Sequence, residues 1–200
     1  LMTFASLISF SIFALTAAVT PGPNNIMLAA SGANYGFRRT LPHIIGICVG
    51  FGFLVIAGGL GLGTFLQNFP QFFSFVKLFA LFFLLYLAWR IGTASSPEIS
   101  KDSKPIRFHT AAFFQWINPK GLTVVISSIA AYTETATSIW QALPLMVLIF
   151  VLVTAIGTCL WALLGTLISE FLANKKHRVA FNITMAFLLL MSMLPAILSL

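Results

Sequence analysis

Two short polar runs interrupt apolar sequence, and they contain the residue types best suited to bind a small charged molecule. The first run is Thr20, Pro21, Gly22, Pro23, Asn24 and Asn25, and the second is Asn118, Pro119, Lys120 and Gly121. Asn is a common helix cap, and Pro is tolerated in the first turn of a helix because its missing N–H is not needed there. Each run therefore predicts the start of a new helix, whose first turn has about four unpaired N–H groups and a partial positive charge. Such a turn can bind a carboxylate.

The segments before the two runs should end in backbone carbonyls, near 16–20 and 115–117. These carbonyls could accept hydrogen bonds from an ammonium group, so two helix starts and two helix ends that meet would satisfy both charges of a zwitterion. Pro often makes only a kink in a membrane helix, but paired breaks at matching positions favour a functional site. We therefore predict a substrate-binding site that contains Thr20, Pro21, Gly22, Pro23, Asn24, Asn25, Gln115, Asn118 and Lys120.

Lys120 is the most informative of these residues, because an ammonium near the centre of a bilayer costs on the order of 3 kcal/mol. No acidic residue is predicted at that depth. Three roles stay open: Lys120 could bind the substrate carboxylate, it could bond only to carbonyls freed by the first break, or it could carry a proton because burial disfavours its charged form.

Lys77 is a second candidate for proton coupling, although its side chain could also extend to the interface. We expect His43 and His109 near the inner boundary, as solvated side chains.

The elements that must position these residues are membrane helices. Of the 200 residues, 59% are hydrophobic, 8% are charged and 21 are Phe, and the mean hydropathy is +1.00. A globule of this size cannot hide that much apolar surface, so we predict an all-α integral membrane protein that contacts the lipid bilayer. The net charge of +7 does not indicate nucleic-acid binding, because basic and aromatic residues are not interleaved on an exposed surface.

Six apolar runs are long enough to cross a bilayer. They are 3–34, with the first break inside it, 41–66, 72–91, 110–132, with the second break, 142–168 and 179–200. The first, third and fifth connections contain or border nine Lys or Arg residues, and the second and fourth contain none. Because cytoplasmic loops retain Lys and Arg, both termini should face outward. We expect 3–34 to be a membrane span and not a cleaved signal peptide, because no basic residue precedes it.

A polar linker at 94–108 divides the chain into a first repeat at 1–93 and a second repeat at 109–200. Each repeat has three spans, so the second enters the membrane from the opposite side, and the two are candidates for an inverted repeat. Pro21 and Pro119 occupy matching positions in the first and fourth spans. We therefore predict six transmembrane helices in two inverted three-helix repeats, with helices one and four broken near mid-membrane and facing each other.

Small residues four apart predict close helix packing in the second span, at Gly46 and Gly50 and again at Gly59 and Gly63. The packing could be within a subunit or across a homodimer. Cys48 and Cys159 fall inside predicted spans, away from an oxidising aqueous loop, so we expect no structural disulfide.

The same residues resemble the lysine exporter (LysE/RhtB) family of bacterial amino-acid efflux proteins. The resemblance rests on the run Thr20 to Asn25, on Gly36-Phe37-Arg38, on Lys77 with Tyr86-Leu87-Ala88, on Lys104-Pro105-Ile106, on Gln115 with Asn118-Pro119-Lys120, and on Trp161-Ala162-Leu163-Leu164-Gly165. It covers essentially the whole chain. The Lys104 segment and Cys159-Leu160-Trp161-Ala162 are most similar to the cysteine and O-acetylserine exporter branch. The chain departs from the family pattern in the third span, at Ala80 and Phe83.

The resemblance implies six spans, export of small amino acids or their derivatives across the inner membrane, and coupling to protons. No catalytic nucleophile with a base and no glycine-rich phosphate loop is present in the sequence, so we expect a transporter without a cofactor and not an enzyme or a nucleotide-driven pump.

Two rival classes belong to related membrane folds. A thiol-redox electron carrier would use the one cysteine in each half. A metal-ion exporter would need a cluster of ligands at membrane depth, and we predict none.

Overall fold

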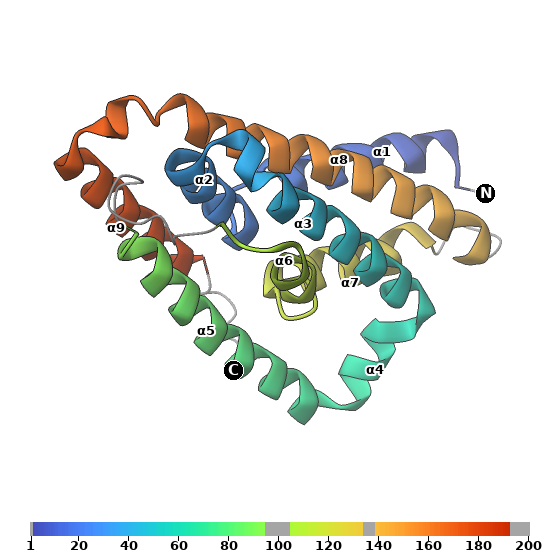
Figure 1. Ribbon diagram of the computed structural model, residues 1–200. Helices are drawn as coiled ribbons and strands as arrows, with labels where there is room; N and C mark the ends of the chain where they lie inside the picture. The colour runs from blue at the N-terminus through green and yellow to red at the C-terminus, as the bar shows by residue number, and fades with distance from the viewer. Residues whose placement is uncertain (1, 95–104, 134–138, 193–200) are drawn as a thin grey trace.

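The computed structural model describes residues 2–94, 105–133 and 139–192, and every regular element within these ranges is helical (Figure 1). The helices are α1 (Phe4–Val19), α2 (Pro23–Tyr35), α3 (Phe37–Ala57), α4 (Gly63–Asn68), α5 (Pro70–Gly92), α6 (Phe108–Phe114), α7 (Pro119–Thr133), α8 (Ile139–Leu167) and α9 (Lys175–Met191). A π-type turn at Gly58–Leu62 joins α3 to α4, and a short 3₁₀ turn at Phe171–Ala173 precedes α9. Most of the predicted linker at 94–108 lies outside the described residues.

Several of these helices have the length and composition of membrane spans. Within the described ranges, the three segments Phe37–Asn68, Ser74–Gly92 and Ile139–Leu167 qualify, and a fourth span is formed if α1 and α2 are taken together. The axes of α1 and α2 are bent by 50° at the break between them. The all-helical membrane fold and the break in the first span are therefore confirmed.

Both predicted breaks separate two helices, and in both cases Pro is the first residue of the second helix. Pro23 begins α2 and Pro119 begins α7. The expected Asn cap is wrong for α2, because Gly22 occupies the cap position in an extended conformation and makes no side-chain hydrogen bond. Asn24 and Asn25 instead lie inside the first turn, where their amides are free to bond to other elements. In the second break Asn118 does directly precede the first residue of the helix.

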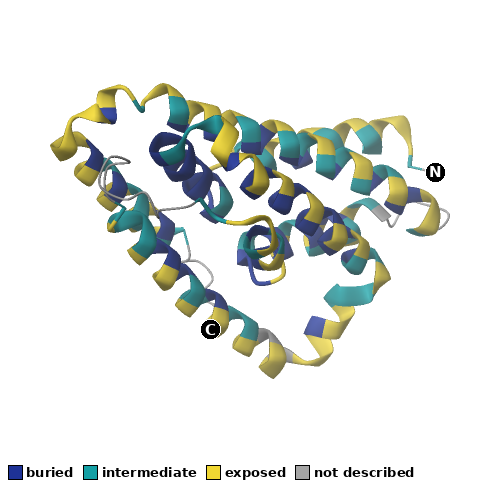
Figure 2. Ribbon diagram, in the orientation of Figure 1, coloured by how far each residue is buried: buried dark blue, intermediate teal, exposed yellow. Residues whose placement is uncertain are grey.

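The helices pack around the broken segments. α8 lies along α1, α2 and α3, α5 packs on α9, and α6 sits between α3 and α5 (Figure 1). Exposed residues follow the outer faces of α5 and α8, and many of them are Phe, Leu or Ile, as expected for surfaces in contact with lipid (Figure 2). α2 is the exception, because all of Asn25 to Asn34 is buried. A helix that is buried on every side has its first turn held rigidly by its neighbours.

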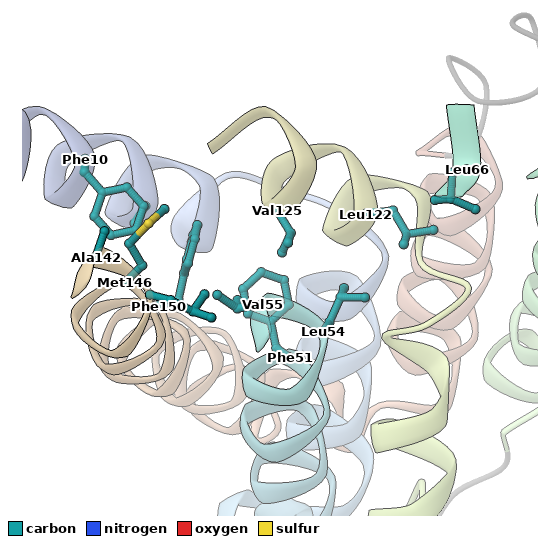
Figure 3. Packing of buried hydrophobic residues seen from close by; sticks show 12 residues of the cluster. Phe10, Phe51, Leu54, Val55, Leu66, Leu122, Val125, Ala142, Met146 and Phe150 are labelled. Atoms are coloured by element: carbon teal, nitrogen blue, oxygen red, sulfur yellow. The ribbon is translucent and has the colours of Figure 1, made fainter. Parts of the chain in front are cut away.

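The hydrophobic core contains a cluster of three aromatic rings, those of Phe10, Phe51 and Phe150 (Figure 3). The Phe150 ring meets the rings of Phe10 and Phe51 edge to face, with centroids 4.9 and 5.4 Å apart. Edge-to-face pairs at these distances are favourable beyond the area they bury. The cluster therefore ties α1 and α3 to α8 next to the first break.

Glycines allow the closest helix contacts, and all of these contacts are within one subunit. A Cβ atom on Gly32 of α2 would collide with the Ala162 carbonyl of α8, and one on Gly165 of α8 would collide with the Ala29 carbonyl of α2. Gly50 faces the Ala112 backbone of α6 in the same way, with 2.5 Å from an added Cβ to the carbonyl oxygen. Gly46 and Gly50 thus pack against α6, the helix before the second break, whereas Gly59 meets the Leu143 side chain of α8. Gly36, between α2 and α3, has φ +78° and ψ 164°, a conformation that is nearly restricted to glycine.

Candidate functional site

A cavity of about 60 Å³ lies where the two breaks meet. Its lining includes the first turns of α2 and α7 together with Val124 of α7. α1, α3 and α8 complete the wall with Ala14, Ala17, Ala18, Ile47, Phe51, Phe150, Thr154 and Thr158. A water molecule needs about 10–15 Å³ of such volume, so the cavity holds several waters or the small end of a ligand. We call it the central cavity.

The central cavity has two helix starts with unpaired backbone donors. The N–H groups of Ile26 and Leu122 bond to the carbonyls of Gly22 and Asn118, at 3.0 and 2.9 Å. The N–H groups of the two residues before each of them, Asn24 and Asn25 in α2 and Lys120 and Gly121 in α7, have no acceptor among the described residues. Because Pro has no N–H, each restarted helix thus offers two free donors and the positive end of its dipole. Together they favour an anionic group.

Asn118 adds an unpartnered polar atom to the same wall. The side chain is 3% exposed, and its Oδ1 atom has no hydrogen-bond donor within the described part of the chain. Buried side-chain oxygens in proteins are nearly always bonded. The Asn118 amide therefore requires a donor from a water molecule or a ligand in the cavity.

Lys120 crosses from α7 to the first break. Its Nζ atom donates a hydrogen bond of 2.6 Å to the carbonyl of Thr20, at the end of α1. The Lys120 side chain lies against Gly22, since an added Cβ there would be 2.7 Å from Lys120 Cδ. Of the three roles that the sequence left open, the bond to a freed carbonyl is the one adopted in this structure. It does not exclude the other two, because a substrate can compete for the same ammonium.

The other carbonyls at the end of α1 are also bonded. The Asn25 amide donates to the carbonyls of Ala18 and Thr20, at 2.9 and 2.8 Å. The Trp161 indole N–H, from α8, donates to the Val19 carbonyl at 3.0 Å. The chain's own donors therefore occupy the carbonyls of Ala18, Val19 and Thr20, which belong to the first of the two sets that the sequence offered to a substrate ammonium. Trp161 is a site residue that sequence reasoning did not assign to the break.

A reciprocal amide pair joins the two breaks. The Asn24 amide donates to Gln115 Oε1 at 2.8 Å, and Gln115 Nε2 donates back to Asn24 Oδ1 at 3.2 Å. Gln115 is fully buried and also donates to the Ala111 carbonyl at 2.9 Å. Gln115 does not line the central cavity. It holds the first turn of α2 against the end of α6.

The pair predicts energetic coupling between the two breaks. Asn24→Ala leaves Gln115 Oε1 buried without its donor, and Gln115→Ala leaves the Asn24 amide without its partner, so each change should destabilise the protein by about 1–3 kcal/mol. The double variant should cost less than the sum of the two, by about 1 kcal/mol. The measurement is the apparent melting temperature in detergent, where 1 kcal/mol corresponds to about 2–4 °C. Strictly additive shifts would show that the two amides do not act as a pair.

The structure brings most of the predicted site residues to the central cavity. Those that line it are Gly22, Pro23, Asn24, Asn25, Asn118 and Lys120. Thr20 contributes through its carbonyl, whereas Pro21 and Lys77 are not among the lining residues. Sequence reasoning missed Thr154 and Thr158, two polar residues on one face of α8. Their spacing of four residues inside an apolar span was a signal that could have identified them.

Two further expectations concern titratable side chains. The expectation of a solvated His43 is wrong: the ring is fully buried in α3, and neither of its nitrogens has a hydrogen-bond partner in the described residues. Cys48 and Cys159 are both free thiols, and Cys48 Sγ lies 4.0 Å from Thr158 Oγ1. Among the described residues, no group of three or more His, Cys, Asp or Glu could hold a metal ion.

Comparison with known proteins gives one family and a consistent set of relatives. A family profile described as LysE type translocator matches residues 15–197. A cysteine/O-acetylserine efflux protein of Escherichia coli (strain K12) is 29% identical over 192 residues, which cover 94% of this chain and 95% of the relative. A protein of the same description from Shigella sonnei (strain Ss046) matches with the same identity and coverage. No solved structure gives a significant match.

Proposed function

This chain belongs to the LysE type translocator family, and from that premise we propose that it exports small amino acids or their derivatives from the bacterial cytoplasm. Cysteine and O-acetylserine are the first substrates to consider, because the relatives with 29% identity are described as efflux proteins for these two compounds. Both are small zwitterions. The family membership makes the chain a transporter and not an enzyme.

The observation that carries this proposal is that free backbone N–H groups, with partial positive charge, and a backbone carbonyl, with partial negative charge, meet at the central cavity. Free N–H groups at the starts of α2 and α7 suit a carboxylate. The Thr20 carbonyl suits an ammonium, since it already accepts one from Lys120 at 2.6 Å. An α-amino acid has these two groups a short distance apart.

Lys120 gives this site a simple exchange reaction. In the present conformation its ammonium takes the place that the substrate ammonium would occupy at Thr20. An incoming carboxylate attracts Lys120 Nζ away from the Thr20 carbonyl, and the carbonyl then becomes free for the substrate ammonium. The exchange keeps both charges compensated throughout, which matters because an unpaired charge at this depth is costly.

We further propose that export is coupled to protons and that six spans form two inverted repeats, 1–93 and 109–200. The Lys and Arg residues of the first, third and fifth connections would then lie in the cytoplasm, and both ends of the chain in the periplasm. The two breaks, each with Pro as the first residue of the new helix, support a repeat that includes one broken helix in each half. Lys120 is the residue that we assign to coupling. If its ammonium releases a proton, the neutral amine no longer attracts the substrate carboxylate, and the exchange at the Thr20 carbonyl ends. Lys77 is a weaker candidate, since it does not line the central cavity.

The test is efflux from proteoliposomes loaded with a panel of neutral, basic and acidic amino acids. We expect small neutral amino acids to leave the proteoliposomes faster than they leave loaded liposomes without protein. Efflux should be faster still when the external buffer is more acidic than the lumen. A protonophore should remove that acceleration. Export that is electrogenic and insensitive to pH would contradict proton coupling, and no export of any amino acid would contradict the proposed function.

The two thiols provide a control for the electron-carrier alternative. The variant with Cys48→Ser and Cys159→Ser should export at a rate within about threefold of the parent, because Cys48 is buried and Cys159 half-buried, and free cysteines in such positions act as small packing residues. The same efflux assay measures it. Complete loss of function with an intact fold would favour a redox carrier instead.

A further inference from the structure

A second, larger cavity opens at the other end of α2. Its volume is about 370 Å³, within the range of about 300–1,000 Å³ of small-molecule sites. The lining residues that carry the argument are Asn34, Gly36, Arg39, Ser169, Glu170 and Arg178. They come from the end of α2, the start of α3, the segment between α8 and the 3₁₀ turn, and the first turn of α9. Because the connections involved contain Arg38, Arg39, Lys175 and Lys176, this cavity lies on the side that we propose to be cytoplasmic, and we call it the inner cavity.

Arg178 is the unusual residue of the inner cavity. Its side chain is only 8% exposed, and its Nε atom donates to the Leu172 carbonyl at 2.9 Å. Its Nη1 atom is buried and has no hydrogen-bond partner in the described residues. A guanidinium cannot lose its charge in a protein, and a buried unpaired one is costly. The arrangement is explained if an oxyanion from outside the chain binds there.

The other charges around the cavity favour a zwitterion over a simple anion. Arg39 and Glu170 are exposed at the mouth of the cavity, and no ion pair links Glu170 to either arginine among the described residues. The Glu170 carboxylate would repel an inorganic anion but would attract an ammonium group. The end of α2 also has the partial negative charge of a helix C-terminus, which favours an ammonium.

We propose that the inner cavity captures a zwitterion, with its oxyanion on Arg178 and its ammonium on Glu170. The proposal rests on the proposed function, since the zwitterion in question is the amino acid to be exported. A phosphatidylethanolamine headgroup has the same pair of charges, and the experiment must distinguish the two sources.

The geometry gives this site a place in transport. α2 has 13 residues and joins the inner cavity at Tyr35 to the central cavity at Pro23, a length of about 20 Å at 1.5 Å per residue. Capture at the cytoplasmic end would raise the local concentration of substrate next to the helix that leads to the central cavity. Loss of the capture site should therefore raise the substrate concentration needed for half-maximal export, and it should leave the maximal rate almost unchanged.

The experiment compares Arg178→Gln with Lys175→Gln, a control that removes an exposed cation from the same connection without touching the inner cavity. Both are reconstituted in liposomes of phosphatidylcholine and phosphatidylglycerol, and the rate of L-cysteine efflux is measured against its lumenal concentration. We expect Arg178→Gln to raise the half-saturating concentration about tenfold, as loss of a charge-assisted bond to a carboxylate implies, with less than a twofold change in maximal rate. Lys175→Gln should match the parent. Unchanged half-saturation in Arg178→Gln, with an active parent, overturns this inference alone, whereas an inactive parent overturns the proposed function.

Direct binding tests the inner cavity even if no export is found. L-cysteine binding to the protein in nanodiscs is measured by equilibrium dialysis in the Lys120→Met background, so that the central cavity contributes little. Glu170→Gln, at an exposed position, should weaken the binding of L-cysteine and should not weaken that of acetate. Unchanged binding of L-cysteine by this variant would overturn the zwitterion assignment. If the Lys120→Met protein in nanodiscs with phosphatidylethanolamine no longer binds L-cysteine, and adding Arg178→Gln stops its co-purification with that lipid, the zwitterion is the lipid headgroup. If binding is the same with and without Arg178, the site does not exist.

Discussion

Lys120→Met should lower the rate of amino-acid export about 30-fold while the protein stays folded. Met has a similar length, so it preserves the contact with Gly22, but it cannot donate to the Thr20 carbonyl or attract a carboxylate. Hydrogen bonds to charged groups contribute about 1.5–3 kcal/mol, and each 1.4 kcal/mol corresponds to about a tenfold change in rate. The measurement is the initial efflux rate from loaded proteoliposomes, normalised to the amount of reconstituted protein.

Two controls make the result specific. Lys175→Met removes an exposed lysine of the fifth connection and should leave the rate unchanged. Lys77→Met removes a lysine of α5 that does not line the central cavity, and we expect a change of less than about threefold. If Lys120 also carries the coupled proton, the acceleration by an acidic external buffer should disappear in Lys120→Met. A parental rate in Lys120→Met would mean that its ammonium only satisfies the Thr20 carbonyl.

Gly32→Ala should destabilise the protein strongly, although it adds only one methyl group. The added Cβ would meet the Ala162 carbonyl of α8 well inside van der Waals contact, and a backbone atom cannot move aside as a side chain can. Overpacking typically costs about 1–3 kcal/mol and sometimes more, so we expect the upper end, about 3 kcal/mol. For a protein of this size this corresponds to an apparent melting temperature lower by about 6–12 °C.

Gly92→Ala is the matched control. The same substitution at the end of α5 places the Cβ 3.5 Å from Ala186 Cβ, an ordinary contact. It should shift the melting temperature by no more than about 2 °C. Gly165→Ala, at the reciprocal contact with Ala29, should behave like Gly32→Ala. Equal effects of Gly32→Ala and Gly92→Ala would show that α2 and α8 do not approach each other this closely.

The size of the central cavity has a consequence for transport. About 60 Å³ holds a few waters, which is too little for a whole amino acid. The first turns of α2 and α7 must therefore separate before a substrate can enter. The bonds that span the two breaks, from Lys120 to Thr20 and between Asn24 and Gln115, are the contacts that such a movement has to break or carry along.

The sequence alone determined the class of protein and the places where its helices break. Both follow from local properties: apolar composition decides which solvent surrounds the chain, and Pro removes a backbone donor wherever it stands. The runs from Thr20 to Asn25 and from Asn118 to Gly121 could be assigned as helix starts without any knowledge of their neighbours, although only the structure showed that Pro23, and not Pro21, is the first helical residue of the first run. The same local rules placed Lys120 in the second break, but they did not assign its partner.

Only the tertiary structure decided which groups meet at the breaks. Lys120 bonds to a residue 100 positions away, Gln115 to one 91 positions away, and Trp161 to one 142 positions away. Packing of α2 against α8 and of α3 against α6 produces these contacts, and no local pattern encodes them. The same packing buried His43, which the sequence placed in water, and left Arg178 buried with one nitrogen unpaired. Burial and hydrogen-bond partners depend on what the other helices bring to a position, and a single helix does not contain that information.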